Sequence, residues 1–180
     1  DLELRTLEQL FQECLEEPGA RAAIVTAPPG TGKSRLAQEI LRTIQARGEP
    51  VAVWLSRGEL HRAGSAFGML SQLVRAACGI QGSEPLELAR DKLVARVATR
   101  CGESERQRIA EFLGELAGVT FPDDDSPPLR AARQDAHLMN EQLLAAFLDF
   151  LRAETAAHPV VLVLEDVHWL DSASLLLALL

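Results

Sequence analysis

The stretch that most constrains the fold of this chain is a glycine-rich turn, Ala27-Pro28-Pro29-Gly30-Thr31-Gly32-Lys33-Ser34. The run Ala22-Ala23-Ile24-Val25-Thr26 precedes the turn, and we predict a first buried strand over residues 21–27. A helical pattern over residues 35–41 follows the turn. Because glycine lacks a Cβ atom, the backbone at Gly30 and Gly32 can turn sharply and approach a ligand closely. A helix that starts directly after such a turn points its first amide groups and its positive dipole end into one concavity. The order of strand, glycine-rich turn and helix therefore predicts an anion-binding site.

The residue types in the turn indicate that the anion is a phosphate group and that the turn is a P-loop. The predicted nucleotide-binding residues are Pro28, Pro29, Gly30, Thr31, Gly32, Lys33, Ser34 and Arg35. Lys33 is expected to place its ammonium group on the β- and γ-phosphates, and the Ser34 hydroxyl is expected to ligate Mg²⁺. Ala27 stands where the pattern usually has its first glycine, and its methyl group fits there if φ stays negative. The alternative is a chance match in a loop rich in glycine and alanine.

Lysine usage favours the P-loop interpretation. The chain contains only two lysines, Lys33 and Lys92, and its other basic residues are arginines. A compact ammonium group at position 33 suits a site where a broad guanidinium would fit poorly. The choice of lysine there is therefore informative in a chain that otherwise uses arginine.

A second informative stretch begins with five apolar residues at 160–164, which predict a buried strand. Glu165 and Asp166 follow at its carboxyl end, where open parallel sheets bind ligands. The pattern has the form of a Walker B segment. Glu165 and Asp166 are predicted to bind Mg²⁺ together with Ser34, directly or through water. Lys33, Glu165 and Asp166 are the predicted catalytic residues, with Asp166 orienting or deprotonating the attacking water.

The remaining sequence predicts a mixed α/β chain with a helical insertion. Apolar periodicity predicts helices over residues 2–17, 35–47, 66–78, 86–101, 104–117 and 129–156. A second strand is predicted over residues 51–55, and Asp171 with Ser172 is predicted to cap a final helix over 173–180. Far more residues separate Lys33 from Glu165 than one strand and one helix require. We therefore predict an inserted helical subdomain over about residues 66–156.

Composition excludes several other classes of function. The formal net charge of −8 argues against a broad nucleic-acid-binding face. No run is long and apolar enough for a membrane helix, and the first residues resemble neither a signal nor a transit peptide, so a cytoplasmic location is expected. Cys14, Cys78 and Cys101 are isolated in the sequence and are expected to be free thiols. Asp123, Asp124 and Asp125 are expected in a solvated loop within the low-order stretch 118–128, with cation binding as the alternative.

Together, the loop Pro-Gly-Thr-Gly-Lys-Ser-Arg-Leu and the segment Leu-Glu-Asp-Val-His-Trp-Leu-Asp resemble those of the STAND class of P-loop ATPases. More closely, they are similar to the AAA-type ATPase module of large bacterial regulators, which include LuxR-type transcription activators, some serine/threonine kinases and adenylate cyclases. The resemblance is strong over residues 21–42 and 160–180, and it is looser across the helical middle.

The resemblance implies a three-layer α/β/α P-loop NTPase fold with a parallel sheet, of which residues 1–180 form the N-terminal portion of a single domain. Family members continue beyond the Walker B segment, so the chain is expected to be a fragment, with other domains of the same polypeptide as partners and possible nucleotide-dependent self-association. The family's His-Trp pair falls on His168 and Trp169, where His168 contacts the γ-phosphate or is structural. Arg57, Arg130 and Arg133 are candidates for phosphate contacts or are ordinary surface arginines.

The expected function is binding and hydrolysis of ATP with Mg²⁺ in a regulatory module. A second hypothesis is a nucleotide-gated switch that holds ADP or ATP with negligible turnover. A third is a phosphotransferase resembling nucleotide kinases, although the sequence offers no basic lid for a second substrate. Steady multiple turnover would separate the first hypothesis from the second.

Overall fold

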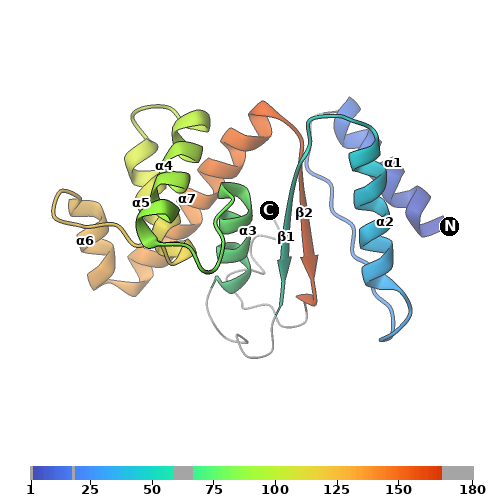
Figure 1. The fold of residues 1–180 in the computed structure, drawn as a ribbon, viewed down its shortest axis with the longest axis horizontal. Helices are drawn as coiled ribbons and strands as arrows, with labels where there is room; N and C mark the ends of the chain where they lie inside the picture. The colour runs from blue at the N-terminus through green and yellow to red at the C-terminus, as the bar shows by residue number, and fades with distance from the viewer. Residues whose placement is uncertain (1, 18, 59–66, 168–180) are drawn as a thin grey trace.

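The computed structural model describes residues 2–17, 19–58 and 67–167, and within them the chain combines a two-stranded parallel sheet with seven helices (Figure 1). The strands are β1 (Ala52–Arg57) and β2 (Val160–Glu165). The helices are α1 (Leu2–Glu16), α2 (Lys33–Ala46), α3 (Gly68–Cys78), α4 (Leu86–Arg100), α5 (Arg106–Ala117), α6 (Pro127–Gln134) and α7 (Ala136–Ala157). The predicted α/β class with a parallel sheet is confirmed.

The sheet joins two segments that are far apart in the sequence. β1 and β2 pair in register from Ala52 opposite Val160 to Arg57 opposite Glu165. Parallel strands require a crossover connection, and here that connection consists of α3 to α7. Figure 1 shows these helices grouped on one side of the strands, with α1 and α2 on the other. The helical segment predicted between the second strand and the Walker B strand is therefore present.

The hydrophobic core lies where the helices α3 to α7 pack together and against β1. Phe112, Phe147 and Phe150 are completely buried, and Trp54 of β1 stacks on Phe150 with 5.8 Å between ring centroids. By contrast, α1 contains no buried residue and α2 contains only Ile44. Burial of apolar surface is the main favourable term in folding, so the described chain is stabilised chiefly on the α3–α7 side.

The strand predicted over residues 21–27 is absent. The whole segment is exposed and has no assigned strand, and Ile24 retains 84% of its accessible surface. Within the described residues no backbone hydrogen bond connects this segment to β1 or β2. A strand exists through its ladder, and the apolar run alone does not supply one. The prediction of a buried first strand is therefore wrong for this structure.

The helix predicted over residues 129–156 is divided in two. Ser126 caps α6, and the first two residues of this helix are Pro127 and Pro128. The end of the predicted low-order stretch is therefore helical. Proline is well tolerated in a first turn because its missing amide hydrogen has no partner there. Asp135 then has extended backbone angles and caps α7 by accepting hydrogen bonds from the amides of His137 and Leu138.

The other predicted boundaries agree with the structure to within a few residues. The final helix over 173–180, its capping pair Asp171 and Ser172, and the pair His168 and Trp169 lie outside the described residues. None of the described helices has the length and apolar character needed to cross a membrane.

Candidate functional site

The glycine-rich turn adopts the backbone that its sequence predicts. Gly30 and Gly32 have φ values of +78° and +98°, in the left-handed region that side-chain-bearing residues avoid. Gly32 is the N-cap of α2, and its carbonyl oxygen accepts the first helical hydrogen bond from the amide of Leu36 at 2.9 Å. The glycines thus let the chain reverse directly into a helix.

Lys33 folds its side chain back over this turn. Its Nζ donates hydrogen bonds to the carbonyl oxygens of Ala27 at 2.7 Å and Pro28 at 3.0 Å. The Thr31 hydroxyl also donates to the Pro28 carbonyl at 2.7 Å. Within the described residues no carboxylate forms an ion pair with Lys33. The ammonium charge is therefore held at the loop by neutral oxygens only.

The first turn of α2 presents unused hydrogen-bond donors. In the described part of the chain, no backbone or side-chain acceptor pairs with the amides of Lys33, Ser34 or Arg35. A Cβ atom built at Gly30 or Gly32 would meet no atom within 4 Å, so the space beside the loop is open. Unpaired amides, the helix dipole and a lysine charge together suit a phosphate group. The predicted nucleotide-binding residues thus share one turn and one helix start.

The predicted Walker B acids lie together where β2 ends. Glu165 is the last residue of the strand, and its side chain retains 14% of its surface. Asp166 follows with a φ of +54°, a conformation that aspartate tolerates better than most residues. This backbone reversal accompanies the end of the strand and places both carboxylates at the carboxyl edge of the sheet.

Arg57 is paired with these acids. It is the last residue of β1 and lies opposite Glu165 in the ladder. Its guanidinium forms a two-nitrogen contact with the Glu165 Oε2 atom, with the Nε donor at 2.8 Å, and Nε lies 3.8 Å from Asp166 Oδ2. The hydrogen bond to Glu165 raises the pKa of Arg57, and the attraction of both carboxylates adds to that increase.

The oxygen groups available here fit a hard divalent cation such as Mg²⁺. The donors are the exposed hydroxyl of Ser34 and the carboxylates of Glu165 and Asp166, and oxygen is the ligand that Mg²⁺ prefers. Figure 1 shows the start of α2 and the carboxyl ends of both strands at the same end of the molecule. No hydrogen bond or ion pair within the described residues connects the turn to the acids. The residues of the glycine-rich turn thus form one cluster and the two acids form another, and no described hydrogen bond or ion pair joins the two clusters.

The other two candidate arginines have local structural partners. Arg130 donates to the carbonyl oxygens of Asp123 and Asp124 at 2.9 and 2.6 Å. Arg133 pairs with Glu115 at 2.6 Å and with Asp123 at 3.0 Å. Both arginines therefore brace the loop before α6. Among the described residues there is no group of three acidic, histidine or cysteine side chains arranged to hold a metal.

Sequence reasoning missed Gln72, which fixes the backbone of Arg57. Its side-chain oxygen accepts from the Arg57 amide at 2.9 Å, and its side-chain nitrogen donates to the Arg57 carbonyl at 2.9 Å. The two residues lie 15 positions apart on β1 and α3. No local pattern marks such a contact, because it depends on how the helix packs on the strand.

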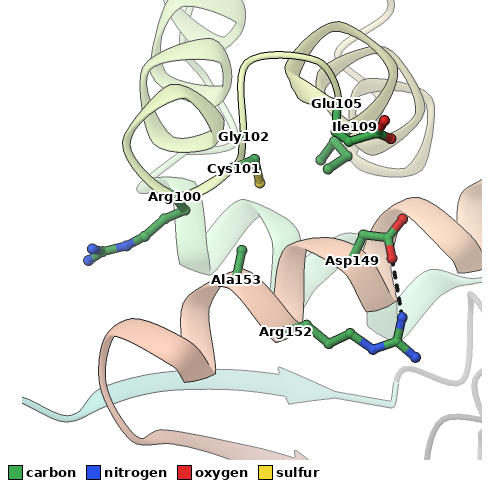
Figure 2. A pocket seen from close by; sticks show the side chains of 8 residues that line it. All are labelled: Arg100, Cys101, Gly102, Glu105, Ile109, Asp149, Arg152 and Ala153. Carbon is green, nitrogen blue, oxygen red and sulfur yellow. Dashed lines mark hydrogen bonds and ion pairs between the residues drawn. The ribbon is translucent and has the colours of Figure 1, made fainter.

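A hollow of about 410 Å³ lies away from the predicted site (Figure 2). It is formed by the end of α4, the start of α5 and the middle of α7. Arg100, Glu105, Asp149 and Arg152 contribute charges of both signs, and Arg152 is bonded to Asp149 at 3.3 Å. None of the predicted nucleotide-binding residues lines this hollow. Its mixed, mutually paired charges do not select one kind of ligand.

Comparison with known proteins identifies the class. The family model described as AAA ATPase domain matches residues 1–180, and the chain belongs to this family. It is also similar to an uncharacterized protein of Rhizobium meliloti (strain 1021), with 28% identity over 178 residues. That alignment covers 96% of this chain and 16% of the relative, so the chain spans about a sixth of the relative's length. No solved structure shows a significant match.

Proposed function

We propose that this chain is the ATP-binding and ATP-hydrolysing part of a regulatory module in a larger signalling or transcription-regulating protein. Membership of the AAA ATPase domain family supports nucleotide binding and, at the level of the family, ATPase activity. The observation that carries the proposal is Lys33, whose ammonium lies on the Ala27 and Pro28 carbonyls beside the unpaired amides that start α2.

Each predicted residue has a distinct role in this proposal. The amides from Gly30 to Arg35 bind phosphate oxygens, and Lys33 neutralises charge that develops as the γ-phosphate leaves. Ser34 and Glu165 hold the divalent ion directly or through water, and Asp166 orients the attacking water. The ion, when bound, neutralises phosphate charge. The pair Pro28 and Pro29 with Thr31 shapes the turn around these groups.

The regulatory context rests on sequence resemblance. The STAND class and the ATPase modules of LuxR-type activators, serine/threonine kinases and adenylate cyclases resemble this chain in both motifs. The relative from Rhizobium meliloti is much longer than the aligned region, which favours a module that works beside other segments. The same observation favours our second candidate, a switch that holds ADP or ATP and uses slow hydrolysis only as a reset.

The first prediction concerns Lys33. Thermal melts with and without MgATP should show stabilisation of the unchanged chain, because a ligand at 100 times its Kd adds about 2.7 kcal/mol. Lys33→Ala should abolish this increase, since it removes the charge at the loop. Lys92→Ala is the matched control, because Lys92 pairs with Glu84 and the Gly79 carbonyl, away from the loop.

An MgATP-dependent stabilisation that survives in Lys33→Ala would contradict the role of Lys33. Loss of the stabilisation in Lys92→Ala as well would indicate a general loss of structure. Turnover separates the two candidate functions: steady phosphate release over many cycles by the full-length protein without a partner would exclude the switch. Nucleotide that stays bound through purification would favour it.

A further inference from the structure

The ion pair at the ends of β1 and β2 uses an acid that the proposed function assigns to magnesium. Two nitrogen atoms of Arg57 donate to Oε2 of Glu165, and Nε also faces Asp166 at 3.8 Å. In the described residues no other basic side chain forms an ion pair with either acid. The Oε2 atom, which accepts two charge-assisted hydrogen bonds, has few lone-pair directions left for a metal ion. Within the described residues Oε1 accepts no hydrogen bond, so the competition concerns the charge of the carboxylate and one of its two oxygens.

Arg57 offsets the electrostatic repulsion between the two acids at the end of β2. Glu165 and Asp166 are adjacent in the chain and carry like charges at the end of one strand. Like charges at short distance raise one another's free energy, and a cation beside both relieves this repulsion. Arg57 supplies a charge of +1, whereas a divalent ion supplies +2 to the same oxygens.

The backbone of Arg57 is fixed, whereas its guanidinium group is free to move away from Glu165. Gln72 bonds both the amide and the carbonyl of Arg57, and the strand register fixes its Cα opposite Glu165. The side chain of Arg57 nevertheless retains 55% of its surface. Water can therefore reach the guanidinium and replace its hydrogen bonds when the pair opens, although the Glu165 side chain is largely covered. The guanidinium can therefore rotate into solvent without disturbing the sheet.

We propose that Arg57 competes with the divalent cation for the negative charge of Glu165, so that the metal ion binds more tightly when the Arg57–Glu165 pair is open. The inference rests on the proposed function for the identity of the metal site. Its consequence is a threshold: the ion pair raises the metal concentration at which the acids become occupied. In this arrangement Arg57 is a positioning residue and not a catalytic one.

Binding of Mn²⁺ in the absence of nucleotide tests the competition directly. The loss of the electron paramagnetic resonance signal of free Mn²⁺ measures this binding. Arg57→Gln should lower the Mn²⁺ dissociation constant by up to about fivefold, as expected for an ion pair with one partner in solvent. Arg42→Gln is the matched control, because it removes the same charge from an exposed pair, here with Glu39 on α2. This control should leave the Mn²⁺ dissociation constant within about 1.5-fold of the original, because salt screens the effect of an exposed charge that is not in contact with the acids.

A second comparison ties the effect to the acid. In a Glu165→Gln background, Arg57→Gln should no longer tighten Mn²⁺ binding, because the contested oxygen has lost its charge. Unchanged or weaker Mn²⁺ binding in Arg57→Gln, or a gain that persists without the Glu165 carboxylate, would overturn the proposal. Circular dichroism of each variant verifies that the fold is retained.

MgATP melts of the same variants keep the two proposals separate. If ATP with Mg²⁺ fails to stabilise the unchanged chain while Arg57→Gln still tightens Mn²⁺, the nucleotide function is wrong and the competition stands. If ATP stabilises the chain but Arg57→Gln leaves Mn²⁺ binding unchanged, the competition is wrong and the nucleotide function stands.

Discussion

Gly114 lies inside α5 at a position where two rules about glycine conflict. Replacing a helical glycine with alanine usually stabilises a helix by about 1 kcal/mol. Here an added Cβ would lie 2.5 Å from the carbonyl oxygen of Val119 and 2.6 Å from the ring of Phe121. The Val119 backbone cannot retreat easily, because its amide bonds back to the Gly114 carbonyl at 2.7 Å. The steric term should therefore win.

We predict that Gly114→Ala lowers the free energy of unfolding by about 2 kcal/mol, in the range of overpacked cores. Urea unfolding followed by circular dichroism measures this change. Gly102→Ala is the control, because a Cβ there meets nothing within 4 Å, and its effect should stay within about 0.5 kcal/mol. A neutral Gly114→Ala would mean that the α5 turn adjusts more easily than its contacts indicate.

At this scale the sequence was informative where backbone geometry depends on residue type. The sharp turn expected at Gly30 and Gly32 is present, because it depends on residue type alone. The hydrogen bonds of Lys33 to the Ala27 and Pro28 carbonyls were not predicted, and its contact with phosphate stays a prediction. The two hydrogen bonds between the Gln72 side chain and the Arg57 backbone could not be predicted in this way. Glutamine is common on helices, and only the packing of α3 against β1 gives this one its role.

The ends of α4 and α7 are joined by a buried charge cluster. Glu154 is completely buried and accepts two hydrogen bonds from Arg96, at 2.6 and 2.7 Å. Arg100 and His158 also face its Oε2 atom, at 3.3 and 3.2 Å. Removing one member of such a cluster leaves the others without a counter-charge in a poorly solvated place.

We predict that Glu154→Gln destabilises the chain by about 3 kcal/mol, at the lower end for a broken buried pair because both arginines remain partly exposed. Glu87→Gln is the matched control on α4: its pair with Arg90 is formed by a carboxylate that is 79% exposed. That change should cost less than about 0.5 kcal/mol. Equal effects in the two variants, measured by urea unfolding, would contradict the structural role of Glu154.

Helices were predicted well because their apolar periodicity is local, and their exact ends depended on single residues. The break at Asp135 shows the limit. Aspartate is compatible with a surface position in a long helix and is also a strong N-cap. The choice between them depends on whether α6 can pack Leu129 and Ala132 into the core. This is a tertiary condition that periodicity does not contain.

Across the whole molecule, buried thiols should control the response to alkali. Burial raises the pKa of Cys78 to about 12 and also raises the pKa of Cys101. The chain has no tyrosine and only two lysines, so few other groups titrate in this range. An unfolded thiol loses its proton near pH 8.5–9, whereas the folded Cys78 thiol keeps its own. Stability from Cys78 is therefore complete below about pH 9 and is lost as the pH rises towards 12.

We predict that the free energy of unfolding falls by about 1.4 kcal/mol per pH unit for Cys78 alone above pH 9. Urea unfolding at intervals between pH 8 and pH 10.5 measures the slope. Cys78→Ala should reduce it by that amount, and Cys14→Ala, which alters a half-buried thiol on α1, should retain it. A slope that is the same in Cys78→Ala would show that other groups account for the alkaline loss.

The sheet was the least predictable part of the molecule. Apolar runs identified β1 and β2, yet the strand predicted at residues 21–27 forms no ladder within the described chain. Pairing is a property of two segments, and no single run specifies its partner. The same limit applies to the predicted site. The turn and the acids could each be recognised from local sequence, whereas the distance between them depends on how the sheet is assembled.

The exposed run beside the P-loop has a practical consequence for handling the protein. Ile24 and Val25 face solvent in a segment with no assigned helix or strand, and exposed β-branched residues of this kind favour intermolecular cross-β association. Arg21 on one side and the pair Pro28 and Pro29 on the other flank the run. Charges and prolines in such places act as gatekeepers against fibrillar growth. We therefore expect the prolines of the glycine-rich turn also to limit association of this apolar segment between molecules.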